Sequence, residues 1–499
     1  MSNELLLSLL VIIPLVSGLV SQFFASKWLT LLISATGVMI TAAFGAVAIH
    51  RTITQGTIFG LSDWLFLDPL SAFHLAVLLM VFGLSSLFSI RYFGEELEHS
   101  YLTLSQIRTF SGLWTPAMAA MILVLISNNL GIMWVGMEAT TLLTSFLICV
   151  HMTRESLEAM WKYLLICSVG IAFAFLGTLL LRLAAKDLPL DPNQALLWTN
   201  LMANTKSLAP ALIKAAFIFA LVGYGTKAGL APMHTWLPDA HSKAPSPVSA
   251  IFSGFMLNAA LYCIMRFVPI VEATTGNTGW SLRLLTGFGL FSILLASTFI
   301  LHQHDLKRLL AYCSVEHIGI ITLGFGIGGA GTYAALFHTL NHSLSKTLSF
   351  FAAGRLGQVY GTYKMDRMAG SVKISPIWGL GIFASLLALI GVVPFSVFMS
   401  EFQILKAAVD GERVGVVILF LLGISTVFVG ILRHALSIAW GKPGEYVDSA
   451  SINWLDRLLV AAPLIVLLVL GLWMPQPLHS LMRQAAAVIH NTHDIGDAP

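Results

Sequence analysis

Apolar segments of about 20 residues, separated by short polar loops, follow one another along the whole chain. A helix needs roughly 20 residues to cross about 30 Å of hydrocarbon, so this pattern predicts about fourteen membrane-spanning helices. The predicted spans lie near residues 4–24, 28–49, 68–90, 112–126, 130–150, 160–183, 210–231, 246–268, 284–301, 308–326, 331–354, 376–408, 414–439 and 455–474. No polar stretch is long enough for a soluble catalytic domain. The predicted fold class is all-α, a polytopic membrane helix bundle.

The composition agrees with this fold class. Of the 499 residues, 57% are hydrophobic and 10% are charged, whereas soluble proteins carry about 25% charged residues. A net charge of +3 gives no reason to expect nucleic acid as a partner. The N-terminus lacks a basic region and a small-residue cleavage site, so the first apolar segment is predicted to remain as a span.

No cofactor and no metal is expected. The sequence contains no phosphate-binding glycine loop, dinucleotide fingerprint or nucleophile triad, and therefore predicts no catalytic centre of its own. The cysteines lie apart in apolar segments without a Cys-x-x-Cys pair, which indicates buried thiols. They are Cys149, Cys167, Cys263 and Cys313.

Loop charge predicts the orientation. With the N-terminus outward, basic residues such as Arg91, Lys307 and Arg355 fall in inward loops, which hold about twice as many of them as the outward loops. An even number of spans then returns the C-terminus to the outer side. We therefore expect a multi-pass protein of the cytoplasmic (inner) membrane with both termini outward.

Two predicted spans contain helix-breaking residues. Gly229 and Pro232 follow Lys227, and Gly391 and Pro394 precede Glu401. Such residues free carbonyl groups that must be satisfied by protein or water, and paired broken helices often mark a transport site. The alternative is ordinary glycine and proline, which are frequent in membrane helices.

Charged residues inside the spans point to a function, because a bare charge in hydrocarbon is costly. Glu138 is the only acidic residue of its span, and Lys227 lies in another. Burial disfavours the charged ammonium and a nearby carboxylate favours it, so the pair could switch the lysine between protonation states. The alternative is a static ion pair that holds two helices together.

A polar stripe follows one later span. His338, His342 and Lys346 are spaced i, i+4, i+8, which places them along one slowly turning helix face that Asn341 extends. Imidazoles titrate near neutral pH and suit proton transfer through water. A zinc site is disfavoured because Lys346 would repel the cation. Core histidines bonded to serines are the other alternative.

Three further groups are candidates. Lys307 begins a predicted helix that also contains Glu316 and His317 well inside its apolar run, whereas Arg308 is predicted to be an interfacial anchor. Glu401 could release protons outward, or could cap the helix segment that follows the second break.

Together these motifs resemble the proton-pumping, antiporter-like membrane subunits of respiratory complex I and of multisubunit cation/proton antiporters. The similarity runs from about residue 128 to 401, and its most specific stretch is KAGLAPMHTWLPDAHSKAPSPVSA, supported by DLKRLLAYCSVEHIG and HTLNHSLSKTLSFFAAG. MWVGMEATTL, WKYLLICSVG, SGFMLN and YCSVEHIG look most similar to the F-type subunit of group 4 membrane-bound hydrogenases and formate hydrogenlyases.

The resemblance implies two inverted five-helix repeats in a fourteen-helix bundle, each with one broken helix. It divides the chain into N-terminal spans (1–110), a first repeat (111–268), a second repeat (269–440), and a last span with a tail (441–499). It implies that Glu138 is the acidic partner of a switching Lys227 and that Glu401 is the terminal residue of the path. It places His338, His342 and Lys346 on the central-to-exit axis, with Lys307 at the start of a neighbouring helix.

The chain departs from this pattern in SAIFSGFMLNAALY, where some relatives carry a central lysine or histidine. Only Ser253 and Asn258 are available there, and neither titrates. We therefore expect a polar relay of Ser253, Asn258 and Asn341 with water, or transfer through the histidines or through Glu316 and His317. No long lateral helix is expected after the last span, unlike the distal complex I subunit.

The leading hypothesis is a proton-translocating subunit of a membrane-bound redox complex, of the hydrogenase or NADH-dehydrogenase type. Its expected partners are other membrane subunits, a peripheral redox or uptake module, membrane lipid, and protons, with sodium as the alternative ion. One alternative is a component of a cation/proton antiporter or of a gradient-driven uptake system for an inorganic solute such as inorganic carbon. Another is a membrane scaffold whose channel is vestigial.

Overall fold

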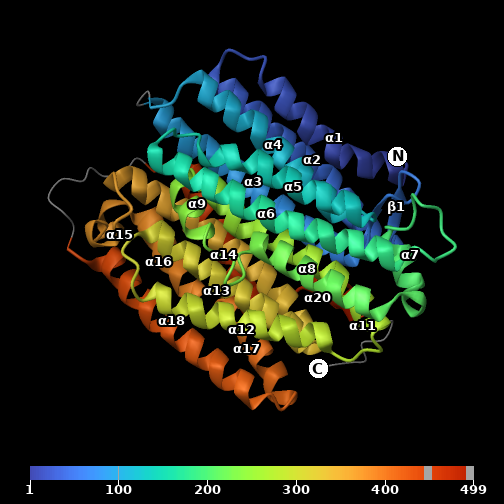
Figure 1. Cartoon of the computed structure of the whole chain (residues 1–499). Coiled ribbons are helices and arrows are strands. Elements are labelled where there is room, and N and C mark those ends of the chain that lie inside the picture. The colour runs from blue at the N-terminus through green and yellow to red at the C-terminus, as the bar shows by residue number, and fades with distance from the viewer. Residues whose placement is uncertain (99–100, 443–451, 491–499) are drawn as a thin grey trace.

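The computed structural model describes residues 1–98, 101–442 and 452–490. Residues 443–451 and 491–499 of the predicted C-terminal region lie outside the described residues. Long helices pack side by side in one bundle, and the described residues include a single two-stranded antiparallel sheet in which Ile58 pairs with Leu67 (Figure 1). The predicted all-α membrane bundle is confirmed.

Helices account for nearly all of the elements, from α1 at the N-terminus to α20. The first part of the chain forms α1 (Asn3–Ser21), α2 (Lys27–Gln55), β1 (Ile58–Gly60), β2 (Leu65–Leu67), α3 (Pro69–Glu98) and α4 (Leu104–Ile126). The middle forms α5 (Leu130–Ile148), α6 (Arg154–Ala184), α7 (Trp198–Ala203), η1 (Thr205–Ser207), α8 (Pro210–Ala228), α9 (Leu237–Lys243), α10 (Ser246–Ile251), the π-helical η2 (Phe252–Met256) and α11 (Leu257–Thr274). The remainder forms α12 (Trp280–Ile300), α13 (Leu306–Ile327), α14 (Ala330–Tyr360), η3 (Met365–Arg367), α15 (Ser371–Ile374), α16 (Pro376–Leu389), α17 (Ser396–Asp410), α18 (Val414–Trp440), α19 (Trp454–Leu472) and α20 (Gln476–His490).

Twelve helices of the described chain are long and apolar enough to cross a membrane. The two other predicted spans differ from these in physical character. The span at 331–354 is the 31-residue α14, which is long but rich in polar residues, and the span at 376–408 is divided between α16 and α17. The protein is a multi-pass membrane protein, and the count of fourteen spans stays a prediction.

The centre of the bundle is formed by helices that are buried on all sides. The helical stretch Ser246–Thr274 and helix α13 are buried throughout their most apolar 18 residues, whereas about a third of the corresponding residues are buried in α18 and α19. A helix that is apolar all round belongs in a core or against lipid. The four cysteines are free and buried, in agreement with their predicted role as packing residues.

Both predicted breaks are present. Helix α8 ends at Ala228, Gly229 adopts a left-handed conformation with φ of 79°, and a cis Ala231–Pro232 bond precedes α9. Helix α16 ends at Leu389, Gly391 has φ of 65°, and a cis Val393–Pro394 bond precedes α17. A positive φ favours glycine, which explains why the chain turns at these positions. The repeat boundaries at 111, 269 and 440 stay predictions.

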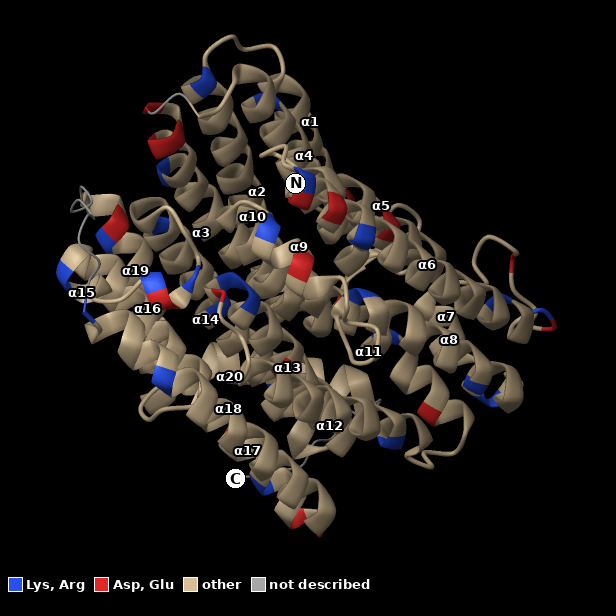
Figure 2. Cartoon of the chain, turned by 60° about the vertical axis from the view of Figure 1, so that its left-hand side comes forward, with Lys and Arg blue, Asp and Glu red and all other residues tan. Residues whose placement is uncertain are grey.

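The two ends of the bundle differ in charge. One end, which we call the basic end, carries a set of ion pairs, and Figure 2 shows that most charged residues lie toward the ends of the helices. These pairs are Arg91–Asp456 at 3.1 Å, Arg355–Glu95 at 3.2 Å, Lys162–Asp239 at 3.0 Å and Arg308–Asp239 at 2.6 Å. The start of α1 lies at the opposite end, where Glu4 packs close to Gly60 of β1. The predicted facing of the two ends stays a prediction.

Candidate functional site

Lys227 lies in a completely buried pocket between α5, α6 and α8. Its Nζ donates to the hydroxyl of Thr141 at 2.9 Å and to the hydroxyl of Tyr163. The Tyr163 hydroxyl also shares a 2.6 Å hydrogen bond with Thr144, and Nζ lies 4.5 Å from the Tyr163 ring centroid. An ammonium group is thus held by neutral hydroxyls and an aromatic face, partners that stabilise the charge without a carboxylate in direct contact.

Glu138 was predicted as the acidic partner of Lys227, with a static ion pair as the alternative, and that direct ion pair is not present between the described side chains. Glu138 accepts a 2.9 Å hydrogen bond from Ser168, and its Oε2 is buried with no protein partner. No ion pair within 4.0 Å joins it to Lys227 among the described side chains. Thr141, one helical turn after Glu138 on α5, receives the lysine instead. The two charges are therefore close neighbours separated by hydroxyl groups.

The centre of the bundle carries a neutral polar link. Ser253 lies in the π-helical segment η2 and shares a 2.7 Å hydrogen bond with Ser314 on α13. Asn258 donates to Ser343 on α14 at 3.1 Å. Short π-helical segments frequently occur at functional sites. Both predicted relay residues thus connect this helix to the helices that carry the histidines.

A chain of hydrogen bonds joins α13, α14 and α17. His317 Nδ1 and His338 Nε2 are 2.9 Å apart, and His338 Nδ1 is 2.9 Å from the hydroxyl of Ser400. Asn341 donates to Ser400 at 3.1 Å and to the carbonyl of Ser396 at 2.8 Å. All five residues are buried. A protonated imidazole can pass the shared proton to the neighbouring neutral ring, which can then release the proton on its other nitrogen, so this chain can pass a proton between helices.

Glu401 lies at the end of this chain. It is 8% exposed, and its Oε2 lies against Gly391, where an added Cβ would collide with it. The predicted cap of the α17 dipole is wrong, because α17 begins at Ser396 and its first turn holds no acidic residue. Donor atoms of His317, His338 and Glu401 all lie within 4.8 Å of one another, so this group is the one that could hold a metal ion among the described residues.

Two buried lysines face backbone carbonyl groups. Lys346 donates to the carbonyl of Leu310 at 2.8 Å, and Lys307 donates to the carbonyl of Ala244 at 2.5 Å. Glu316 is 2% exposed, and its Oε2 lies 3.9 Å from His317 Nε2. Carbonyl oxygens compensate only part of the cost of burying an ammonium group. Both lysines are therefore held in place by backbone carbonyl groups of neighbouring segments.

His342 completes the predicted stripe. Its ring centroid lies 5.3 Å from that of His317, and neither of its nitrogens has a protein partner. His241 on α9 is also fully buried with both nitrogens unpartnered. The sequence analysis did not single out His241, Tyr163 or Ser400, although the first two lie within motifs that it quoted. A histidine in a polar motif next to a helix break is the signal that could have found His241.

Arg308 has the predicted position of an anchor. It is 38% exposed at its side chain and pairs with Asp239, which also accepts from Lys162. Burial raises the pKa of Asp239, but the hydrogen bonds from Lys162 and Arg308 outweigh it, so the pKa lies below its usual value. This carboxylate therefore stays charged and tethers α9 to α6 and α13.

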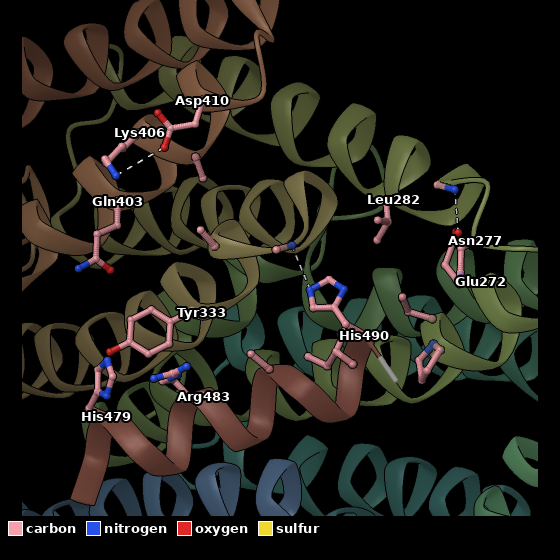
Figure 3. Close-up of a pocket in the computed structure, with 18 of the residues that line it drawn as sticks. Glu272, Asn277, Leu282, Tyr333, Gln403, Lys406, Asp410, His479, Arg483 and His490 are labelled. Atoms are coloured by element: carbon pink, nitrogen blue, oxygen red, sulfur yellow. Dashed lines mark hydrogen bonds and ion pairs between the residues drawn. The ribbon is translucent and has the colours of Figure 1, made fainter. Parts of the chain in front are cut away.

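A large cavity lies away from Lys227. It has a volume of about 650 Å³ and is bordered by residues of α11, α12, α14, α17 and α20. Figure 3 shows Tyr333, His479 and Arg483 along one side and the Lys406–Asp410 ion pair along another. Gln403, two residues after Glu401, also borders it. The buried polar chain thus points toward a hollow at the end opposite the basic end.

Two broken helices and a line of buried titratable groups define the antiporter-like class of membrane subunit. Residues 127–429 match the family described as NADH:quinone oxidoreductase/Mrp antiporter, transmembrane. The chain belongs to this family. It is 40% identical over 360 residues to the hydrogenase-4 component F homolog of Methylacidiphilum infernorum, covering 72% of this chain and 75% of that protein.

Two further comparisons agree. The chain is 29% identical over 451 residues to NADH-quinone oxidoreductase subunit N of Desulforudis audaxviator, covering 86% of each chain. Its fold matches a chain of the archaeal membrane-bound sulfane sulfur reductase complex with a TM-score of 0.86 and 23% identity, covering 97% of each chain. The chain is thus an antiporter-like membrane subunit, as the sequence motifs predicted.

Proposed function

We propose that this chain translocates protons across the cytoplasmic membrane as a subunit of a membrane-bound redox complex. The observation that carries the proposal is the continuous hydrogen bonding from His317 through His338 to Ser400, which ends beside Glu401 inside the helix bundle. Buried titratable groups in a membrane protein are costly and generally serve ion or proton movement.

Lys227 is the proposed gate of this path. Its hydroxyl partners can remain in place whether or not the lysine is charged, because Thr141 and Tyr163 can each donate as well as accept. The carboxylate of Glu138 lies one helical turn before Thr141 on α5. When this carboxylate is ionised, it favours the protonated form of Lys227. A shift of charge at Glu138 would thereby release or recapture the proton.

The driving reaction is assigned to partner subunits. Relatives include a hydrogenase-4 component homolog and an NADH-quinone oxidoreductase subunit, which support a redox module as the partner. A cation/proton antiporter component is the second candidate, supported by the 30% identity over 414 residues to a Na⁺/H⁺ antiporter protein of Alkalihalophilus pseudofirmus. Identification of the co-purifying subunits separates the two.

The test replaces Lys227 by Met and Glu138 by Gln in the intact complex and measures proton translocation in membrane vesicles. We expect each variant to lose at least about 100-fold in rate, the lower range for removal of a positioned proton-transfer group. Lys214→Met is the matched control, because Lys214 lies on the same helix α8 but contacts the Trp280 ring. Unchanged translocation in both variants would contradict the proposal.

A further inference from the structure

A carboxylate–imidazole pair lies at the basic end, outside the path described so far. Glu96 near the end of α3 and His151 in the loop between α5 and α6 are joined by a contact of 2.8 Å between Oε2 and Nε2. The His151 side chain is 31% exposed and that of Glu96 is 11% exposed. The pair therefore has one member open to solvent and one facing inward. Histidine is the side chain suited to proton exchange near neutral pH.

Hydroxyl groups extend from this pair toward the interior. Tyr92, one helical turn before Glu96, interacts with the Glu96 carboxylate and with the hydroxyl of Tyr363. Tyr363 also interacts with Ser246, at the start of α10. Hydroxyl groups both donate and accept hydrogen bonds, so they can hand a proton along a chain.

Two glycines of α14 leave the room that these contacts need. A Cβ at Gly354 would collide with the Ser246 side chain and lie 3.4 Å from the Tyr92 ring. A Cβ at Gly357 would lie 2.9 Å from the Tyr363 hydroxyl and closer still to its ring. The tyrosines and the serine can approach α14 only because these positions lack side chains.

Lys307 lies at the inner end of this line. Its Nζ is 5.1 Å from the Tyr363 ring centroid and donates to the carbonyl of Ala244, two residues before Ser246. Leu310 follows one turn later on the same helix, and its carbonyl accepts from Lys346. The line from the surface therefore reaches Lys307, and Lys346, on the helix of the histidines, contacts the next turn of the same helix α13.

The other charged groups around the pair serve as fixed neighbours. Arg355 pairs with Glu95, Arg91 contacts both Glu95 and Asp456, and Gln358 donates to Glu96 at 3.4 Å. Arginine keeps its proton at any physiological pH and cannot relay one. Within this group, His151 contacts Glu96, and Glu96 in turn interacts with Tyr92 of the hydroxyl line.

We infer that Glu96 and His151 form a proton-uptake site that supplies Lys307, and hence the histidine path, from the basic end. The inference rests on the proposed function and adds the place where protons leave the bulk phase. It also explains how the path can operate although only Ser253 and Asn258 stand at the centre of the neighbouring helix. A tether between α3 and the loop is the competing role, and it differs from proton uptake in its expected dependence on pH.

The test uses the intact complex in vesicles whose basic end faces the medium, and compares Glu96→Gln and His151→Gln with the wild type. Glu98→Gln is the matched control, because Glu98 lies in the same last turn of α3 and is exposed. Between about pH 6 and about pH 8, protons become scarce and the collecting group becomes limiting. We expect near wild-type rates at the acidic limit and, at the alkaline limit, a loss on the order of tenfold, which is less than removal of a buried relay group costs.

Imidazole added to the medium gives a second readout, because a soluble proton carrier should restore the translocation rate of the His151→Gln variant at alkaline pH. A tether would behave differently, with an equal loss at every pH and no response to imidazole, and that result would overturn the inference. Wild-type rates for both variants at every pH would overturn it as well. Lys227→Met, measured in parallel, separates the uptake site from the proposed function. If Lys227→Met also translocates protons at the wild-type rate, the proposed function is contradicted. If Lys227→Met is inactive while both uptake-site variants keep the wild-type rate, only the uptake site is contradicted.

Discussion

The two broken helices serve chemically different surroundings. At the first break, α8 brings Lys227 between the hydroxyls of Thr141 and Tyr163, and the carboxylate of Glu138 lies one helical turn before Thr141 on α5. At the second break, α17 brings Ser400 and Glu401 to two histidines that already share a hydrogen bond. Similar backbone interruptions therefore support one isolated charge in the first region and a connected series of titratable groups in the second.

This difference indicates that the two regions have separate roles in proton movement. A single amine whose charge depends on a nearby carboxylate suits a gate, since it has two states and no onward partner of the same kind. A series of imidazoles and carboxylates suits transfer, since each member can receive a proton and give it to the next. Variants in each region can test whether the two regions differ in this way.

The largest effect is expected for His338→Gln. Glutamine can keep a hydrogen bond to Ser400 but cannot take part in tautomer exchange with His317, so transfer should fall by at least about 100-fold. Proton translocation in vesicles containing the intact complex measures it. His342→Gln is the control in the same helix and should lose less, because His342 has no hydrogen-bonded protein partner. Equal losses in the two variants would contradict a path through the His317–His338 pair.

Tyr163→Phe should have an intermediate effect. It removes one hydroxyl from Lys227 but leaves Thr141 in place, and a hydrogen bond to a charged group contributes about 1.5–3 kcal/mol. With one partner remaining, we expect translocation to slow by about tenfold, the lower end of this range, measured in the same vesicle assay. Thr144→Val is informative beside it, because the Thr144 hydroxyl bonds to the Tyr163 hydroxyl and to the Thr140 carbonyl, whereas Lys227 donates to Thr141 and Tyr163. A Tyr163→Phe rate equal to wild type would show that the lysine does not depend on this hydroxyl.

A smaller effect is expected from alanine at the two breaks. Gly391→Ala and Gly229→Ala each impose a left-handed conformation on a residue with a Cβ, which costs about 1–2 kcal/mol of stability. The midpoint temperature of thermal unfolding should therefore fall by a similar amount in both variants. Only Gly391→Ala also displaces the Glu401 carboxylate, whereas Gly229→Ala meets the Leu237 side chain. Translocation should fall more in the Gly391 variant, and the reverse order would contradict the position assigned to Glu401.

The smallest effect is expected for Asp239→Asn at the basic end. The pKa of Asp239 is lowered in the folded state, so its ion pairs stabilise the protein at neutral pH and the stabilisation is lost as the pH falls through that lowered value. Because Lys162 and Arg308 are partly exposed, the loss in the variant should stay below about 1 kcal/mol. Unfolding measured across acidic pH should show a flatter profile for the variant. A steeper profile would contradict the assignment.

Hydropathy was sufficient to predict the bundle, because span length is fixed by the thickness of hydrocarbon. The breaks at Gly229 and Gly391 were also predictable, since glycine and proline act locally on the backbone. The stripe of His338, His342 and Lys346 followed from helical period. These features depend on short stretches of chain and need no knowledge of how the helices pack.

Contacts between distant helices were beyond prediction. Tyr163 in an apolar span is typical of core packing, and nothing in its spacing indicates that it faces Lys227 from another helix. The His317–His338 contact likewise depends on the rotation of α13 against α14. The pairing of Glu138 with Lys227 was predicted from charge alone, and the hydroxyl of Thr141 occupies the direct position instead.

Lys227→Arg in the intact complex tests the gate most directly. Arginine retains the positive charge and its attraction to Glu138, but it cannot release its proton at physiological pH. If Lys227 must alternate between charged and neutral states, the variant should assemble with normal yield and translocate protons as slowly as Lys227→Met. If the arginine variant moves protons at the wild-type rate, a fixed charge is sufficient, and the account of Lys227 as a switch is contradicted.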